Sequence, residues 1–456
     1  MTWLWKIIRD NPLPLWLVLL LTSAFILRIP SFFEPIWYGD EAIYLTVGEA
    51  LRQGFILYRD IHDNKPPLFY MLTIFAGNLF WFKAILAFFA LASAIFFWRI
   101  AQILFPKKEK LAKIATVIFA ILTTIPLFEG NIANAEIFML LPTLAAFFLL
   151  LSPKISRSRI FIAGLSLGMG MLFKVPAILD ALPILVLWFS VFISKRESRV
   201  QVIKNILILG SALSLPLLFT FLLWALQGAF INYMQAAFLQ TIDYLSLWRG
   251  SQSTNTNFLS QNQPLLLRGL LTLALIISLL RLHAKKTIST SLLFVGSWFA
   301  SSVFALTLSE RPYPHYLIIA VPSLALLVGF ATTLKNESQF LPYPLFAIFA
   351  AVLVIFKFQY YSVFPYYQNF LAFALGQKSQ EQYFDQFDHR TNRNYRIARF
   401  LTESASPKSK IFVWGNDPEI YVLSKLLPAT RFVALYHIEE RRAEEKVISG
   451  LANNPP

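Results

Sequence analysis

The sequence predicts an α-helical protein that crosses a membrane many times. Of its 456 residues, 57% are hydrophobic and only 14% are charged, whereas soluble proteins carry roughly 25% charged residues. Apolar runs of about 20 residues, the length that spans a bilayer as a helix, recur along the chain. The net charge of +15 does not indicate nucleic acid, because the basic residues lie in short loops between apolar runs, where they report orientation.

Eleven apolar segments are candidate membrane spans. They are 13–30, 84–105, 112–128, 136–152, 160–178, 181–194, 203–226, 264–281, 288–308, 315–334 and 341–357. Lys6 and Arg9 precede the first run as in a signal peptide, but no small-x-small cleavage site follows, so we expect an uncleaved span. The two basic residues favour a cytoplasmic N-terminus. The chain contains no cysteine, which excludes disulfides and thiol catalysis.

A further apolar segment, 66–82, decides the topology. If it crossed the membrane, all later basic loops would lie outside. These loops are 106–113, 152–159, 194–199 and 281–286. If the segment does not cross, all four loops face the cytoplasm, as the positive-inside tendency requires. We therefore predict a juxtamembrane or re-entrant helix opened by Pro66 and Pro67, with both of its ends outside.

This topology gathers several polar segments on the outer, extracytoplasmic face. They are loops 31–65, 129–135, 227–263 and 309–315, and the tail from about residue 358. The tail mixes charged and aromatic residues as a soluble domain does; 410–414 and 430–435 are β-prone, and 418–425 between them is helical in character. The expected organisation is a transmembrane catalytic domain over 1–357 and a small extracytoplasmic α/β domain over 358–456.

Two adjacent acids, Asp40 and Glu41, follow the first span. They begin an amphipathic helical pattern in which Ile43, Val47 and Leu51 recur every four residues. Acids at a helix N-terminus stabilise the helix by about 0.3–1 kcal/mol, so capping is one explanation. The helix dipole also keeps a carboxylate ionised, as a general base or a metal ligand requires. Glu136, which begins a later predicted span, allows the same two explanations.

Cations and hydrogen-bond donors occupy the same predicted face. Lys65 directly precedes two prolines that fix its backbone; it is either an ordinary interfacial lysine or an ammonium aimed at a phosphate. Arg311, His315 and Tyr316 lie at the outer end of a predicted span. Arginine binds phosphate in bidentate fashion, and histidine and tyrosine add donors, although a lone interfacial histidine is usually structural. Together these residues fit an enzyme that handles an anionic lipid at headgroup level.

The early Asp-Glu pair, the KPPL motif at 65–68, the acid opening a later span and the PYPHYL segment at 312–317 resemble GT-C glycosyltransferases. The resemblance covers roughly residues 1–335 and is to the group of protein O-mannosyltransferases, aminoarabinose transferases (ArnT) and rhizobial Rgt-type enzymes. It implies a polyprenyl-phosphate-linked sugar donor and an inverting transfer on the extracytoplasmic face of the inner membrane. The acceptor is a lipid, a glycan or a protein.

The resemblance also implies roles for individual residues. Asp40 matches the catalytic acid of the first outer loop, with Glu41 as a supporting group, and Lys65 matches the lysine that contacts the donor phosphate. Glu136 stands where the group usually has Asp. Arg311, His315 and Tyr316 are expected to add donor-phosphate contacts. No cofactor is certain; a divalent metal shared by Asp40 and Glu136 is left open, because the sequence shows no clear ligand cluster.

Two other classes of protein are alternatives. A transporter or lipid flippase would carry ionisable residues at mid-span, whereas Arg99 and Lys174 lie towards the ends of their segments. An O-antigen ligase or polymerase also uses polyprenyl donors, but is not expected to combine the early Asp-Glu pair with KPPL. The position of these charges near the ends of their segments and the combination of the Asp-Glu pair with KPPL favour the glycosyltransferase.

Overall fold

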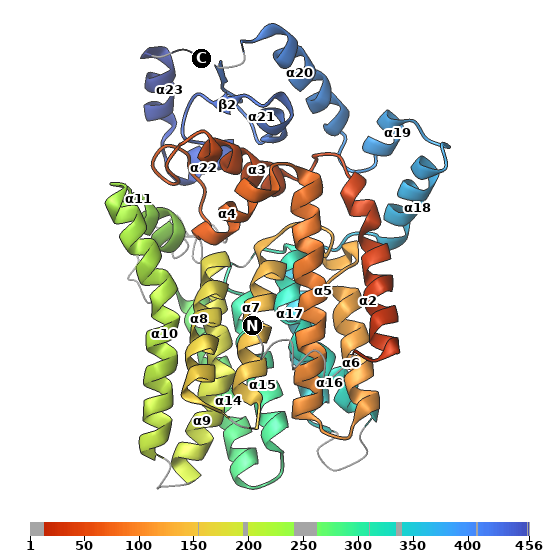
Figure 1. Cartoon of the computed structure of the whole chain (residues 1–456), viewed down its shortest axis with the longest axis vertical. Coiled ribbons are helices and arrows are strands. Elements are labelled where there is room, and N and C mark those ends of the chain that lie inside the picture. The colour runs from red at the N-terminus through yellow and green to blue at the C-terminus, as the bar shows by residue number, and fades with distance from the viewer. Residues whose placement is uncertain are drawn as a thin grey trace.

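A computed structural model describes residues 13–153, 155–194, 199–240, 262–309, 311–333, 340–406, 409–453 and 455. The predicted cytoplasmic Lys6 and Arg9, and residues 241–261 of the predicted outer loop 227–263, lie outside these ranges. Most of the described chain is helical, and its two strands are two residues long. The helices form one elongated bundle with a smaller cap at one end (Figure 1).

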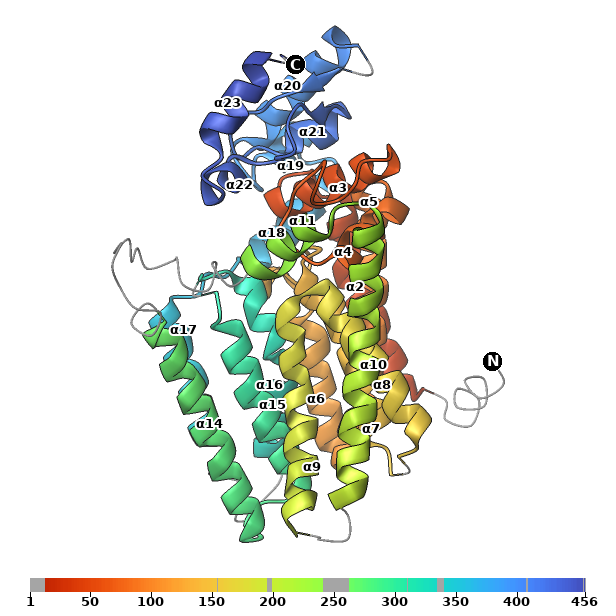
Figure 2. The same cartoon turned by 90° about the vertical axis from the view of Figure 1, so that its left-hand side faces the viewer.

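The bundle helices run side by side along the long axis (Figures 1 and 2). They are α2 (Leu15–Arg28), α5 (Leu79–Leu104), α6 (Glu109–Leu122), α7 (Ala135–Leu151), α8 (Arg157–Phe173), α9 (Leu182–Ser194), α10 (Arg199–Leu226), α14 (Gln263–Ala284), α15 (Thr290–Leu306), α16 (Val321–Thr333) and α17 (Pro342–Phe356). Each of the eleven predicted spans overlaps one of these helices.

Several helical segments have the length and composition of a membrane span. Among the described residues, five qualify: Leu15–Phe33, Leu79–Leu104, Val175–Ser194, Arg199–Leu226 and Gln263–Ala284. The other predicted spans correspond to shorter helices, such as the 17-residue α7 and α15. The protein is therefore of the multi-pass membrane type, while the number of eleven crossings stays a prediction.

Small residues bring α8 and α10 into close contact. A Cβ added to Gly168 on α8 would lie 2.4 Å from the carbonyl oxygen of Leu213 on α10, and one added to Gly164 would lie 2.6 Å from that of Leu209. Glycines four residues apart let two helix backbones approach, which is how helices gain packing energy where lipid removes the hydrophobic drive.

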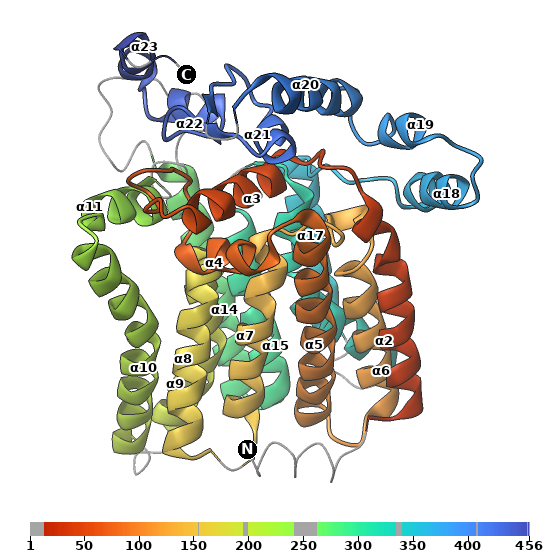
Figure 3. The ribbon, with the colours of Figure 1, turned by 45° about the horizontal axis from the view of Figure 1, so that its top comes forward.

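Two helices lie across the end of the bundle instead of running along it (Figure 3). They are α3 (Gly39–Arg52) and α4 (Pro67–Ala76). With ten residues, α4 is about 15 Å long, half of what a bilayer core requires. Gly77 ends α4 with φ 72°, and Asn78 caps α5, which therefore begins at Leu79, earlier than the predicted span at 84. Segment 66–82 is thus a short transverse helix and the start of the next bundle helix.

Short helical segments fill the connections at this end. They are the 3-10 helices η1 (Ile29–Phe33), η2 (Pro126–Phe128), η3 (Val175–Ala181) and η6 (Pro314–Ile319), the α-helix α11 (Phe230–Tyr233) and the π-helical η5 (Met234–Leu239). Proline at the start of η1, η2, η3 and η6 favours these tight turns.

The tail covers the same end of the bundle (Figure 3). Its elements are α18 (Val363–Ala374), α19 (Gln380–Phe384), α20 (Thr391–Ser404), β1 (Lys410–Ile411), α21 (Glu419–Ser424), β2 (Leu427–Pro428), α22 (Leu435–Glu440) and α23 (Glu444–Asn453). β1 pairs in parallel with β2, so the second strand is not the predicted 430–435. Instead Phe432 forms a parallel bridge with His62, which ties the tail to the loop before α4.

The arrangement predicts a labelling pattern for single cysteines, which stand out because the natural chain has none. Asn78→Cys, between α4 and α5, should react with an impermeant maleimide added outside intact cells. Lys108→Cys, in the basic loop at the far end of α5, should react only after the membrane is permeabilised. External labelling of Lys108→Cys would reverse the topology and move the polar end of the bundle to the cytoplasm.

Candidate active site

A cavity of about 560 Å³ lies where α3, the ends of α7 and α8, η6 and the tail meet. Six of the seven predicted site residues line it: Asp40, Lys65, Glu136, Arg311, His315 and Tyr316. Lys174 lines it as well. These seven residues include two acids and four basic residues, and they come from five separate stretches of the chain. Glu41 is not among the lining residues.

Asp40 and Lys65 form the centre of one wall. Asp40 lies in the first turn of α3, and its Oδ2 is 3.4 Å from Lys65 Nζ and accepts a hydrogen bond of 2.9 Å from the Tyr44 hydroxyl. Burial opposes ionisation of the Asp40 carboxyl, but the charges of Lys65 and His315 and the hydrogen bond from Tyr44 together outweigh it, so the pKa lies below its usual value. The Asp40 side chain keeps 32% of its surface exposed. It is an ionised carboxylate that faces the cavity.

The backbone before α4 holds Lys65 in place. Its carbonyl accepts a hydrogen bond of 2.8 Å from the Tyr58 hydroxyl, and its N–H donates to the Tyr70 hydroxyl at 3.2 Å. Its Nζ also lies 4.6 Å from the centre of the Tyr44 ring, in cation–π geometry. Pro66 then caps α4 in an extended conformation. These three tyrosine contacts hold the lysine in place, while the effect of the two prolines on where the ammonium points stays a prediction.

Glu41 points the other way, into the protein. Its side chain is 2% exposed, its Oε1 lies 2.7 Å from Lys83 Nζ, and it accepts a hydrogen bond of 2.6 Å from the backbone N–H of Ala133. Lys83 also pairs with Glu34 at 3.1 Å, and both of these side chains are fully buried. This ion cluster joins α3 to α5, so the position of Glu41 supports a structural function.

Glu136 belongs to a second cluster of residues that line the cavity. It forms an ion pair with Lys174, and its Oε1 lies 3.8 Å from Nε2 of His315. Lys174 Nζ is also 4.2 Å from the centre of the Tyr316 ring. Glu136, His315 and Tyr316 are therefore brought together as predicted, around a lysine that the sequence analysis did not include among the site residues.

Glu129 contacts the Nδ1 atom of His315 and so orients its ring. Its Oε2 lies 2.5 Å from His315 Nδ1 and accepts hydrogen bonds from the Tyr38 hydroxyl at 2.9 Å and from Asn134 Nδ2 at 3.0 Å. The backbone of Glu129 is left-handed, with φ 59°, a conformation that costs energy in a residue other than glycine and recurs at functional sites.

Two signals in the sequence mark these missed residues. Lys174 stands two positions before Pro176, at the outer end of an apolar helix, much as Lys65 stands before Pro66. Glu129 begins the predicted outer loop 129–135, which also supplies Asn134. Neither signal reveals the partner, because each partner lies on another part of the chain.

Arg311 lines the cavity beside the tail. Its Nη2 lies 3.1 Å from Oε1 of Glu440, and Glu440 Oε2 accepts a hydrogen bond of 3.1 Å from Gln240. The guanidinium of Arg311, which the sequence predicts to bind a phosphate, is thus paired with a carboxylate in this structure. Four tail residues line the cavity, namely Asn416, Tyr436, Glu439 and Glu440.

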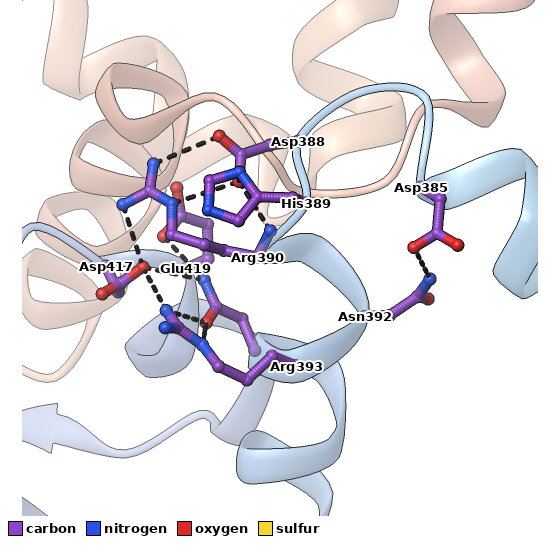
Figure 4. A network of polar contacts seen from close by, with 9 residues as sticks. Asp385, Asp388, His389, Arg390, Asn392, Arg393, Asp417 and Glu419 are labelled. Carbon is purple, nitrogen blue, oxygen red and sulfur yellow. Dashed lines mark hydrogen bonds and ion pairs between the residues drawn. The ribbon is translucent and has the colours of Figure 1, made fainter.

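A polar network within the tail fixes the segment that carries Asn416 (Figure 4). Asp417 Oδ1 lies 2.8 Å from Nη2 of Arg393 and 3.3 Å from Nη1 of Arg390. Arg390 also pairs with Asp388 at 3.1 Å. These contacts attach the start of α21 to α20. The contacts of Asp417 thus fix the neighbouring Asn416, which forms part of the cavity wall.

A second contact attaches the tail to the loop of Lys65. His437 Nε2 lies 3.2 Å from Asp63 Oδ1, and both side chains are almost completely buried. The N–H of His62 donates to the carbonyl oxygen of Arg431 at 2.7 Å. Burial opposes ionisation of Asp63, but Lys65 and His437 outweigh it and lower its pKa. The loop before α4 and the tail are thus one packed unit.

The proposed metal ligands do not make a typical metal site. Within the described ranges, no group of three or more His, Asp or Glu side chains is placed to hold a metal ion. Asp40 and Glu136 are each paired with a lysine, Lys65 and Lys174 respectively. We therefore derive no step through a metal.

Comparison with solved structures identifies the fold. ArnT from Cupriavidus metallidurans bound to undecaprenyl phosphate superposes with a TM-score of 0.56 at 15% identity, over 91% of this chain and 85% of that one. The chain has the GT-C fold. The apo state of the same ArnT gives a TM-score of 0.53 at 14% identity, with the same coverage. The resemblance predicted from the motifs is thereby confirmed for the fold.

Other comparisons add little. An Archaeoglobus fulgidus oligosaccharyltransferase in the apo form aligns with 92% of this chain and 64% of its own length, at 13% identity and a TM-score of 0.48. No protein-family model matches the chain, and no curated protein matches it in sequence.

Proposed function

We propose that the protein is a membrane glycosyltransferase that moves a sugar from a polyprenyl-phosphate donor to an acceptor hydroxyl, with inversion. One observation carries the proposal: an ionised Asp40 shares a single cavity with Lys65, Lys174 and Arg311. A carboxylate beside several cations, in a cavity that also holds Glu136, Glu439 and Glu440, suits a reaction that removes a proton and releases a phosphate. The shared fold supports it, since ArnT was solved with undecaprenyl phosphate bound.

The chemistry needs no strong acid, because a polyprenyl phosphate is a good leaving group. The acceptor oxygen attacks C1 of the sugar from the face opposite the phosphate and forms the new C–O bond. The bond from C1 to the phosphate oxygen breaks, and its electron pair stays on the phosphate. Asp40 takes the proton of the acceptor hydroxyl, and fixed cations such as Lys65 and Arg311 stabilise the departing charge.

Glu136 and His315 complete the proposed site. Glu136 holds Lys174 towards the cavity, and Glu129 fixes the ring of His315, so that both side chains keep their positions before the donor arrives. Preorganised charges of this kind stabilise a transition state without reorganisation. Glu136 is the second candidate for the base.

The proposed location is the inner membrane, with the cavity on the extracytoplasmic side. The basic loops 106–113 and 281–286 lie at the far end of the bundle from α3 and α4, as the positive-inside tendency predicts for a cavity that faces outside. The tail, 358–456, would then be an extracytoplasmic domain that covers the transmembrane domain, 1–357. The acceptor is a lipid, a glycan or a protein of the cell envelope.

A direct test uses purified protein in liposomes with a polyprenyl phosphate that carries a radiolabelled sugar. We expect the label to move to an acceptor in a cell-envelope extract, with release of polyprenyl phosphate. A flippase would move the lipid across the bilayer and leave the sugar–phosphate bond intact. Transport without cleavage would overturn the proposed function.

Lys65 and Arg311 are expected to bind the donor phosphate. Lys65→Ala and Arg311→Ala should each weaken donor binding by about 1.5–3 kcal/mol, the scale of a hydrogen bond to a charged group. The measurement is binding of a fluorescent polyprenyl phosphate to purified variants. Lys446→Ala, which removes an exposed charge from α23, is the matched control. Unchanged affinity in both variants would leave Lys65 and Arg311 with structural functions only.

A further inference from the structure

A second cavity lies next to the one that contains Asp40. Its volume is about 470 Å³, within the range of roughly 300–1,000 Å³ that ligand pockets show. Its walls come from the segment before α3, the loop that begins at Glu129, and α18 with the turn after α19. The proposed reaction uses none of these walls except Glu129.

Aromatic rings form one side of this second cavity. The ring centre of Trp37 lies 6.1 Å from that of Tyr361 and 5.6 Å from that of Phe387. Tyr366 lies 6.3 Å from Phe387, with the two rings nearly perpendicular. Tyr360, which also lines the cavity, is 74% exposed. The aromatic side chains thus support one another and present ring surface to a ligand.

Polar but uncharged groups dominate the remaining surface. The amides of Asn131, Asn369 and Gln386 and the hydroxyl of Ser362 line the cavity, whereas no lysine or arginine is among its described lining residues. Asn131 donates to Glu34, and Asn369 donates to the Tyr383 carbonyl and accepts from Lys378, so the exposed Gln386 is the amide on which the argument rests. Glu129 is the one acid among them, and its carboxylate already accepts several hydrogen bonds. This surface offers little to a phosphate. It suits a neutral ligand with many hydroxyl groups.

The wall between the two cavities is thin and consists of groups that contact one another. Trp37 lines the second cavity, and the next residue, Tyr38, lines the first. Glu129 lines the second cavity, and its partner His315 lines the first, at 2.5 Å. A ligand in the second cavity would therefore lie one side chain away from the group beside Glu136.

We propose that this second cavity binds carbohydrate, and that it holds the sugar of a glycan acceptor while the adjacent cavity holds the phosphate of the donor. Pyranose C–H groups pack on aromatic faces, and sugar hydroxyls pair with amides, which are the two kinds of surface present here. The assignment to the acceptor rests on the proposed function. The binding of carbohydrate does not.

The test measures binding directly, apart from transfer. Methyl glycosides of glucose, galactose, mannose and N-acetylglucosamine are titrated into purified protein by saturation-transfer-difference NMR. At least one should bind with a Kd on the order of 1 mM. Trp37→Ala and Gln386→Ala should each weaken that binding at least 10-fold; the second is an exposed side chain whose loss does not endanger folding. Phe364→Ala, an exposed aromatic of α18 that does not line the cavity, should leave it unchanged.

Several results would overturn the inference. It fails if no glycoside binds, or if binding is the same in Trp37→Ala and Gln386→Ala as in the unaltered protein. It also fails if choline, which aromatic cages also hold, binds in place of the glycosides. It fails as well if undecaprenyl phosphate, titrated separately, binds the two variants more weakly than the unaltered protein, because this cavity would then be part of the donor site. If glycosides bind as expected while undecaprenyl phosphate does not bind even to the unaltered protein, the carbohydrate site stands and the proposed donor fails.

Discussion

Asp40→Asn is expected to lower sugar transfer by about 10²-fold or more, the usual scale for loss of a general base. Asparagine keeps the shape of the side chain and still accepts the hydrogen bond from Tyr44. It cannot accept the proton of the acceptor hydroxyl. The protein should remain folded in the membrane, so the measurement is turnover at matched protein amounts, with donor binding measured separately.

The pH dependence of transfer gives the same prediction a second readout. Because Lys65 holds the pKa of Asp40 below its usual value, the carboxylate is already ionised throughout the neutral and mildly acidic range. Activity limited by Asp40 should therefore stay level as the pH falls towards the ordinary carboxyl value and decline only below it. Lys65→Met should move that decline to higher pH, since it removes the charge that lowers the pKa.

Comparison variants identify the base. Glu41→Gln should cost less than Asp40→Asn, because Glu41 faces the protein interior and not the cavity. Near-normal turnover of Asp40→Asn together with an inactive Glu41→Gln would reverse the assignment. If both remain active while Glu136→Gln is inactive, the base is Glu136 and the pair at 40–41 serves the helix.

Local rules explain why so much of this end of the molecule could be predicted. Prolines at 66 and 67 start a helix, and an acid in a first turn favours one. The positions of the basic loops indicate which end of the bundle faces the cytoplasm. Each of these signals lies within a few residues. The choice of Asp40, Lys65 and Glu136 as candidate site residues rested on such signals, and so did the prediction that 66–82 makes no span.

The remaining contacts depend on partners far away in the sequence. Arg311 meets Glu440, 129 positions later, and His315 meets Glu129, 186 positions earlier. Residues 427–428 of β2 pair with β1, whereas Phe432, in the predicted strand, forms a bridge with His62. No periodicity or spacing reports such pairings. The contribution of the tail to the cavity wall could therefore not be predicted from the sequence.

For the adjacent acids Asp40 and Glu41, the sequence predicts that the side chains diverge but not which partner each one meets. Side chains of consecutive helical residues point about 100° apart, since 3.6 residues make one turn. That geometry predicts that Asp40 and Glu41 cannot both face one hydroxyl. It does not tell which acid meets Lys83, and only the fold places that lysine beneath Glu41.

Lys83→Met is expected to destabilise the protein by about 3–5 kcal/mol, the scale for removing one partner of a buried ion pair. The ammonium of Lys83 lies 2.7 Å from Glu41 and 3.1 Å from Glu34, and all three side chains are at most 2% exposed. It also donates a hydrogen bond of 2.8 Å to the carbonyl oxygen of Asn131. Without it, two carboxylates would remain close together and buried with no compensating charge.

The measurement is the thermal unfolding midpoint in detergent, together with the amount of folded protein recovered. Lys110→Met, which removes an exposed lysine from the far end of the bundle, is the control and should change neither. Glu41→Gln alone should be milder than Lys83→Met. Burial already raises the pKa of the Glu41 carboxyl to about 7, so its neutral form costs little.

A combined variant separates charge from packing. Glu34→Gln and Glu41→Gln added to Lys83→Met remove all three charges, and replacing a buried ion cluster by neutral side chains is often close to neutral in free energy. Most of the lost stability should therefore return. If Lys83→Met is as stable as the unaltered protein, the cluster does not hold α3 against α5, and Glu41 becomes a candidate for the chemistry. If the combined variant is stable and transfers sugar at a normal rate, the catalytic carboxylate at this helix start is Asp40.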